Sequence, residues 1–431
     1  MKKKDLFKTI IREFHNTKLP QYIPRTINIP AASGKIITLV GQRRSGKTYM
    51  LYQIIDNLLT SKISKENIVF INFEDERLEI NKTELDMILQ AYRELYPEKN
   101  MSDVIFFFDE IQNVDGWEKF IRRIYDTLSK NIFITGSNSK LLGQEIATAL
   151  RGRTLQYEVL PLSFIEFLTF KDLHIALPQD VYDSKIKAQL INAMYEYIQW
   201  GGLPEIVFHQ QDMKVKILQE YFDVMIYRDL IERYNVRDIF VLKYFIKRMA
   251  QSVTKPLSIN KIFNELKSQG IKVGKNTLYE FLEYCENAFL IRKINKHEKS
   301  VVKTQLAEKK VYFIDNGILQ AIKFFEREDY GILLENIIFR ELYRVTKNIH
   351  FFKDQKECDF IINSIIPIQV CFAWDDQKTK KRETDGLLTC AKRLHASKGY
   401  VVTFDDEDSI IMDGCTINVV PAYKLLLGMV L

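Results

Sequence analysis

The sequence predicts an α/β protein built from several domains, which begins with a parallel sheet and continues into helical and mixed segments. Short apolar runs alternate with stretches of helical periodicity in the first part of the chain. The pattern then becomes mainly helical, and it ends in two further mixtures of helices and strands. Because 431 residues are too many for one hydrophobic core, we divide the chain into residues 1–170, 171–245, 246–318 and 319–431.

The first segment carries the pattern of a parallel sheet covered by helices. The expected strands are residues 36–40, 68–73, 104–108 and 131–135. The expected helices between them include residues 50–59, 83–95 and 117–128. Two of the strand runs are apolar throughout, which is typical of central strands that are buried on both faces.

A glycine-rich motif follows the first of these strands directly. It reads Gly41, Gln42, Arg43, Arg44, Ser45, Gly46, Lys47 and Thr48, a complete GxxxxGK[ST] pattern. The glycines allow backbone amides to surround phosphate groups, Lys47 supplies a positive charge to them, and the Thr48 hydroxyl binds magnesium. Between a strand and an amphipathic helix, the motif predicts a P-loop NTPase whose cofactors are ATP and Mg²⁺.

Acidic residues end the third apolar run. Asp109 is expected to hold magnesium, and Glu110 is expected to act as the general base on the attacking water. An acidic pair at the end of a strand is a weak signal alone, but it is a strong one after a complete phosphate-binding motif. Glu110 favours hydrolysis of ATP over binding without turnover.

Two further positions are candidates for catalytic roles. Asn138 ends the next strand in Thr-Gly-Ser-Asn and could contact the γ-phosphate or the water, although Gly-Ser-Asn is also ordinary turn chemistry. Arg153, or its neighbour Arg151, could stabilise the transition state as an arginine finger. A solvated basic loop explains both arginines equally well.

The segments that follow are interpreted as a helical lid and a winged helix. The order helix, turn, helix, hairpin from residue 258 to residue 314 is that of a winged helix. Lys275 and Asn276 begin its second helix, and lysines lie along the hairpin at positions 293, 296, 299 and 303. These groups suit duplex DNA, but glutamates at 280, 283 and 286 oppose it, and such modules also serve as ATPase lids.

Several motifs along nearly the whole chain resemble those of prokaryotic AAA-type ATPases that carry a C-terminal domain of unknown function with a restriction-endonuclease-like fold. Besides residues 41–48 and 108–112, the matching motifs are residues 72–75, 134–137, 151–153, 161–167, 201–204, 312–317, 357–360 and 368–370. The resemblance implies an AAA-like ATPase core and a small nuclease-like α/β domain. It implies little about the biological role.

The C-terminal segment departs from an active nuclease. Glu335 and Asp359 match the acidic pattern of such a site, but Gln369 and Cys371 stand where Glu-x-Lys is expected. We therefore expect a degenerate site without cleavage, unless a lysine such as Lys353 or Lys356 replaces the missing one. The basic run from 378 to 382 contacts phosphates or is a solvated helix end.

Composition sets the remaining expectations. The net charge of +6 is mildly basic and permits a nucleic-acid partner without requiring one. Five cysteines without metal-ligand spacing are expected to be reduced and mostly buried. No run is apolar enough to span a bilayer and no signal peptide follows the first lysines, so we expect a cytoplasmic protein with no membrane partner.

The leading functional hypothesis is a magnesium-dependent ATPase that acts as a switch or motor on DNA or on a protein partner, with oligomerisation open. The first alternative is a nucleotide-gated scaffold or signalling protein with negligible turnover. The second is an ATP-dependent nuclease, which the missing lysine disfavours.

Overall fold

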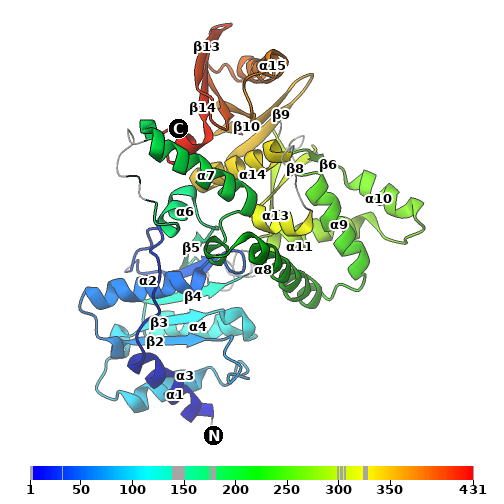
Figure 1. Ribbon diagram of the computed structural model, residues 1–431. Helices are drawn as coiled ribbons and strands as arrows, with labels where there is room; N and C mark the ends of the chain where they lie inside the picture. Colours follow the sequence, from blue (N-terminus) through cyan, green and yellow to red (C-terminus); the bar gives the residue numbers. More distant parts are fainter. Residues whose placement is uncertain are drawn as a thin grey trace. The chain divides into compact units, whose positions relative to one another are not determined.

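The computed structural model describes most of the chain and divides it into two compact units, each with its own sheet (Figure 1). The described residues are 3–31, 33–137, 150, 152–173, 175, 181–298, 300, 304, 307–323 and 329–430. The units meet in sequence at the bond between Leu160 and Pro161. The four-part division expected from the sequence is finer than this and stays a prediction.

The first unit is built on a parallel sheet of five strands in the order β2-β3-β4-β1-β5 (Figure 1). The strands are β1 (Ile36–Val40), β2 (Ile68–Asn72), β3 (Ile105–Asp109), β4 (Ile132–Gly136) and β5 (Thr154–Glu158). The helices are α1 (Lys3–Asn16), α2 (Lys47–Thr60), α3 (Asp86–Leu95) and α4 (Trp117–Thr127). The α/β prediction with a parallel sheet is therefore confirmed.

Helices cover both faces of this sheet, which explains why its central strands are apolar throughout. On one face, Phe107 stacks on Phe133 at a ring distance of 4.6 Å, and both rings join a buried cluster with the apolar side of α2. On the other face, Phe108 of β3 contacts Phe120 of α4. Alternate residues of one strand thus bury against different helices.

The second unit begins with helices. They are α6 (Phe164–Phe170), α7 (Ser184–Trp200), α8 (Gln211–Val224), a π-helical stretch (Met225–Glu232), α9 (Ile239–Gln251), α10 (Ile259–Ser268), α11 (Lys275–Asn287), α13 (Asn316–Ile322), α14 (Tyr330–Val345), α15 (Gln377–Leu394) and α16 (Ala422–Leu426). Except for α15, whose apolar side packs in two smaller clusters, they contribute to one large buried cluster. Among the described residues, no helix combines the length and the apolar character needed to cross a bilayer.

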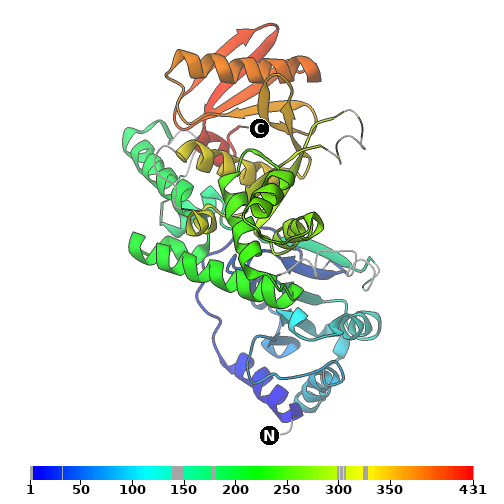
Figure 2. The same cartoon turned by 90° about the vertical axis from the view of Figure 1, so that its right-hand side faces the viewer.

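A single nine-stranded sheet runs through this unit in the order β13-β14-β12-β11-β10-β9-β7-β8-β6. Its strands are β6 (Pro256–Leu257), β7 (Ile291–Lys296), β8 (Lys309–Phe313), β9 (Ile349–Lys353), β10 (Glu357–Ile362), β11 (Ile366–Val370), β12 (Lys398–Thr403), β13 (Asp408–Met412) and β14 (Cys415–Pro421). Strand β7 pairs in parallel with β9, so the hairpin β7-β8 continues the sheet of the C-terminal strands. Helix α15 lies across β10, β11 and β12 (Figure 2).

Candidate functional site

The glycine-rich motif forms a tight loop between β1 and α2. Gly41 has a φ of +152°, and a Cβ atom at this position would lie 2.3 Å from the carbonyl oxygen of Val159. Gly46, which precedes α2, has a φ of +96°. Both positions therefore require glycine, one for close approach of two backbones and one for a left-handed conformation.

The ammonium group of Lys47 points back into this loop. Its Nζ donates to the carbonyl oxygens of Gly41 and Gln42, each at 3.2 Å, and lies 3.4 Å from Oε1 of Glu110. Among the described residues, Gln42 Oε1 and Ser45 Oγ are buried polar atoms without a hydrogen-bond partner. The loop thus holds a buried cation beside polar groups whose hydrogen-bonding capacity is not used.

Asp109, the last residue of β3, lies beside the start of α2. Thr48 Oγ1 donates to its Oδ2 at 2.8 Å, and Thr135 Oγ1 of β4 donates to its Oδ1 at 2.5 Å. Burial, and next the charge of Glu110, raise the pKa of Asp109 to about 6, while the two threonines and Lys47 oppose the rise. Hard oxygen ligands from Thr48 and Asp109 are the kind that Mg²⁺ prefers.

Glu110 takes a strained backbone conformation that turns its carboxylate toward Lys47. Its φ is +50°, and its amide donates to Thr135 Oγ1 at 2.9 Å. Oε2 accepts from Gln112 Nε2 at 2.5 Å and from the Ser137 amide at 3.2 Å. Burial alone would raise the pKa of Glu110, but Lys47 and then Gln112 lower it below its ordinary value, which keeps the carboxylate ionised.

Arg153, another predicted catalytic residue, is not brought to this place. Arg153 precedes β5 and forms an ion pair with Asp126 at 2.9 Å. Its carbonyl accepts from Ile36 at the beginning of β1, so Arg153 lies at the opposite end of the parallel sheet from Gly41. Asn138 and Arg151 lie outside the described residues, and their roles stay predictions.

One residue of the phosphate loop's surroundings was missed from the sequence. Arg25 is only 7% exposed, and its guanidinium donates to the carbonyl oxygens of Ser45 and Leu160, each at 2.9 Å. Its backbone is fixed by Gln53 of α2 through two hydrogen bonds. Arg25 lies in an irregular segment between Pro24 and Pro30, where no periodicity distinguishes a buried arginine from a solvated one.

The helix pair and hairpin of the second unit carry fewer free cations than the sequence suggested. Lys293 is paired with Glu286 at 2.5 Å, and Lys296 is paired with Glu298 at 2.9 Å. The other two hairpin lysines, at positions 299 and 303, lie outside the described residues. Lys275, at the start of α11, is exposed.

A second charged cluster surrounds Lys310 of β8. Its Nζ lies 2.8 Å from Glu357 Oε1, 3.3 Å from Asp359 Oδ1 and 3.6 Å from Glu335 Oε1, and its side chain is only 1% exposed. Burial, and then Asp359, raise the pKa of Glu335 to about 8. The three acidic side chains enclose an internal ammonium group, and within the described residues no cluster of acids, histidines or cysteines suits a metal ion.

The structure brings Glu335, Asp359 and Gln369 close together, and the lysine beside them is Lys310, which was not among the candidates from the sequence. Lys353 forms an ion pair with Glu308, and Lys356 forms one with Asp385; all four side chains are exposed to solvent. Gln369 accepts from the amide of Asp359 at 3.1 Å and donates to Glu383 at 2.5 Å, so it completes a hydrogen-bond network. Lys310 and Tyr312 lie two residues apart in one strand, so their side chains face the same side of the sheet. This spacing was the available signal that Lys310 is buried.

Burial also explains the cysteines. All five are free and buried, as predicted. Burial raises the pKa of Cys371 to about 12, so its thiol is neutral and cannot take the place of a lysine at the end of β11.

Comparisons with known families agree with the first unit and leave the second open. The family described as AAA domain matches residues 33–168, and a domain of unknown function, DUF8612, matches residues 191–329. Residues 33–168 therefore form an AAA-type, P-loop ATPase-like domain.

Relatives match over most of the length of this chain. Uncharacterized protein MJ1544 of Methanocaldococcus jannaschii is 37% identical over 439 residues, which cover 98% of this chain and 95% of that protein. An uncharacterized protein of Haemophilus influenzae is 34% identical over 364 residues, which cover 82% of this chain and 86% of that protein.

The two solved structures described next resemble the chain only distantly. A signal transduction ATPase with a tetratricopeptide repeat sensor from Pyrococcus horikoshii has a TM-score of 0.25 and 11% identity; the match covers 73% of this chain and 44% of that structure. AMPPCP-bound DnaA from Aquifex aeolicus also has a TM-score of 0.25, at 13% identity, over 66% of this chain and 88% of that structure. Similarities this weak carry no argument about function.

Proposed function

This chain belongs to the same protein family as MJ1544 of Methanocaldococcus jannaschii. From the geometry of its AAA-type domain, we propose that it is a magnesium-dependent ATPase that works as a nucleotide-driven switch. The observation that carries the proposal is the convergence of two motifs. Lys47 and Thr48, at the start of α2, meet Asp109 and Glu110, at the end of β3, at distances of 2.8 to 3.4 Å.

The residues of the loop fit the triphosphate of ATP. Phosphate oxygens would replace the carbonyl groups of Gly41 and Gln42 as partners of the Lys47 ammonium, and they would accept from the Ser45 hydroxyl, which is now unsatisfied. Thr48 and Asp109 would hold Mg²⁺, which neutralises phosphate charge when it is bound. We propose residues 41–48 as the nucleotide-binding segment on these grounds.

Hydrolysis would depend on Glu110. Its carboxylate is ionised because Lys47 offsets the cost of burial, and it is oriented by Gln112 and Ser137. A carboxylate fixed beside the phosphate site can accept a proton from the attacking water. The alternative function is a scaffold that binds ATP with negligible turnover. A scaffold would not need an ionised Glu110 carboxylate oriented in this way.

We further propose that the segment formed by α10, α11, β6, β7 and β8 is a winged helix. In support, β7 and β8 form an antiparallel hairpin after two helices joined by a short turn, and β6, which precedes these helices, pairs antiparallel with β8. Duplex DNA would contact the exposed Lys275 end of α11. The pairing of Lys293 and Lys296 with glutamates weakens this surface, so a protein partner is the alternative.

Steady-state turnover of ATP with and without duplex DNA tests the proposal. We expect magnesium-dependent release of phosphate by the wild-type protein, and a higher rate with duplex if DNA is the partner. Binding of ATP without measurable turnover would favour the scaffold. A rate that DNA does not change would favour a protein partner.

The C-terminal strands support a related proposal, namely a restriction-endonuclease-like module that does not cleave. The acids that would bind catalytic metal instead surround Lys310, and Gln369 is committed to hydrogen bonds with Asp359 and Glu383. The neutral thiol of Cys371 stands at the position of the missing lysine. Metal-assisted cleavage would therefore lack its cation site, because Lys310 already pairs with these acids, and it would lack the lysine expected at the end of β11.

We therefore expect no conversion of supercoiled DNA to nicked or linear forms in Mg²⁺ or Mn²⁺, with or without ATP. A double variant, Glu335→Gln with Asp359→Asn, provides the control because it preserves the size of both side chains. Nicking by the wild type that disappears in this double variant would show that the module is an active nuclease.

A further inference from the structure

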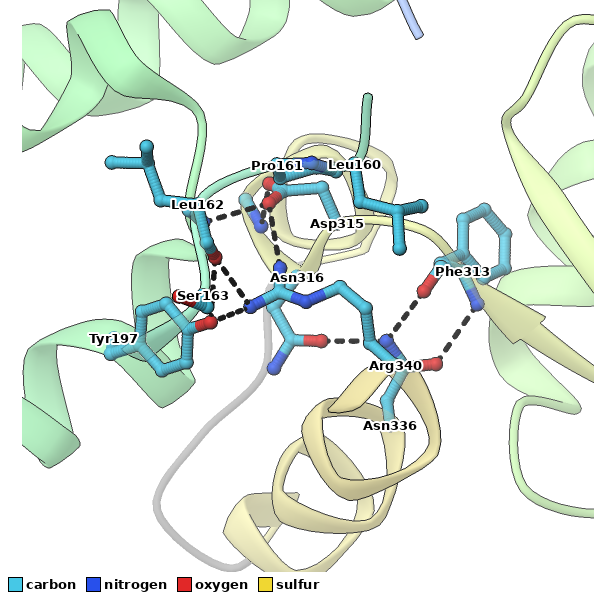
Figure 3. A network of polar contacts seen from close by, with 12 residues as sticks. Leu160, Pro161, Leu162, Ser163, Tyr197, Phe313, Asp315, Asn316, Asn336 and Arg340 are labelled. Carbon is cyan, nitrogen blue, oxygen red and sulfur yellow. Dashed lines mark hydrogen bonds and ion pairs between the residues drawn. The ribbon is translucent and has the colours of Figure 1, made fainter. Parts of the chain in front are cut away.

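Three pieces of the second unit that are far apart in the sequence meet in one buried polar network (Figure 3). They are the segments 161–163, 201–202 and 315–317, joined by side chains of α7 and α14. Arg340 lies at the centre and is 1% exposed. A buried guanidinium is costly unless it is fully engaged, so the network requires an explanation.

The network holds the backbone that directly follows the first unit. The carbonyl oxygen of Leu162 accepts from Tyr197 Oη at 2.7 Å and from Arg340 at 3.3 Å, and its amide donates to Gly202 at 2.7 Å. The carbonyl oxygen of Pro161 accepts from Arg344. Figure 3 shows the Arg340 side chain reaching this segment from α14.

Asp315 anchors the other side of the network. Its carboxylate pairs with Arg340 at 3.3 Å and accepts the amides of Gly202 and Gly317, each at 2.8 Å. A Cβ atom at Gly201 would lie 2.3 Å from this carboxylate. The backbone of residues 201–202 is therefore held between Asp315 and Leu162, and a shift of Leu162 must disturb both.

The residue before this segment is tied to the phosphate loop. Within the first unit, Arg25 bridges the carbonyl oxygens of Ser45 and Leu160, each at 2.9 Å. The carbonyl of Val159 also lies directly against Gly41, as the glycine's close approach requires. The loop that would take the phosphates thus touches the chain immediately upstream of Pro161 at two places.

Residues 160–162, called here the connecting segment, are consequently held at three successive carbonyl groups by three different arginines: Arg25, Arg344 and Arg340. The segment is also stiff, because Pro161 has a fixed φ and restricts Leu160 to extended conformations. Because the segment is stiff and its carbonyl groups are hydrogen-bonded, a displacement of Leu160 is expected to move Leu162 as well.

We propose that Arg25 is a positioning residue that couples nucleotide occupancy of the phosphate loop to the Arg340 network through the connecting segment. The proposal rests on ATP binding at residues 41–48. Phosphates draw Lys47 away from the carbonyls of Gly41 and Gln42, the loop adjusts around Ser45, and Arg25 carries the adjustment to Leu160. The second unit then senses the nucleotide through the hydrogen bonds of Leu162 and Gly202.

Amide hydrogen exchange of the full-length protein, measured by mass spectrometry, tests this coupling. An unhydrolysed ATP analogue with Mg²⁺ should slow exchange in the phosphate loop and, at least about fivefold, at the amides of Leu162 and Gly202. In Arg25→Met at saturating analogue, the loop should remain protected while the change at Leu162 and Gly202 disappears. A role of Arg25 in stability alone would not remove a nucleotide-dependent difference.

Arg77→Met is the matched control, because Arg77 lies in the same unit but pairs on the surface with Asp75 and Glu13; it should respond like the wild type. If Arg25→Met does not fold, Arg25→Lys removes the two-carbonyl bridge with the charge retained, and the same loss is expected.

The outcomes separate the coupling from the site itself. A wild-type phosphate loop that the analogue does not protect contradicts the proposed ATP site. A protected loop with unchanged exchange at Leu162 and Gly202 contradicts the coupling alone, and so does an Arg25 variant that keeps the full response.

Discussion

Replacing Lys47 by alanine is expected to weaken binding of an unhydrolysed ATP analogue by at least a hundredfold. A hydrogen bond to a charged group contributes about 1.5–3 kcal/mol, and Lys47 is proposed to make such bonds to two phosphate groups. Losing about 3 kcal/mol corresponds to roughly a hundredfold in the dissociation constant. Isothermal titration calorimetry of the wild type and the variant measures the difference directly.

Lys35→Ala is the matched control for this variant. Lys35 precedes the same strand, β1, at its other end, where it donates to the carbonyl oxygen of Gly152. Its removal should leave the affinity unchanged. Because Lys47→Ala also leaves the buried Glu110 without its cation, a thermal unfolding curve should accompany the titration. Equal affinities in folded Lys47→Ala and wild-type protein would overturn the site assignment.

The sheet of the first unit could be predicted from local pattern because its strands are apolar runs bounded by turn residues. The first four strands begin and end within one residue of the expected ranges. Strand β5 was missed because it reads Thr-Leu-Gln-Tyr-Glu and lies at the edge of the sheet, half-exposed. An edge strand of this kind lacks the apolar run on which the others were recognised.

The core of the candidate site followed from topology as well as from motifs. In a parallel sheet the carboxyl ends of the strands meet at one edge, so a motif after β1 and an acidic pair at the end of β3 must come close. The same argument excludes Arg153 from the site within one chain, because it precedes β5 at the opposite edge. That conclusion required the position of β5, which the sequence did not reveal.

Long-range pairing explains the remaining differences. From the sequence, Lys310 looks like a solvent-exposed lysine. Its acidic partners cannot be recognised locally, because they come from α14 and β10, which lie later in the chain. The pairing of β7 with β9 joins strands that local pattern assigns to separate modules. The motif around Asp315 could be recognised in the sequence. Its structural role could not, because Asp315 pairs with Arg340, which lies outside any motif.

Changing Glu110 to glutamine is expected to preserve ATP binding and to slow turnover by at least about a hundredfold, the usual contribution of a general base. Glutamine keeps the size of the side chain but cannot accept the proton of the attacking water. The low pKa of Glu110 means that the wild-type group is already ionised at neutral pH. Single-turnover hydrolysis, started with prebound ATP, separates the chemical step from binding.

Glu98→Gln is the control, since Glu98 is an exposed carboxylate after α3 in the same unit and should have no effect on the rate. An unchanged rate in Glu110→Gln would place the base elsewhere. A wild-type protein that binds ATP without measurable hydrolysis would instead show that the oriented carboxylate is not used for hydrolysis, and it would favour the scaffold. Because glutamine removes the ion pair with Lys47 as well as the base, retained affinity in the variant is the result that attributes the lost rate to chemistry.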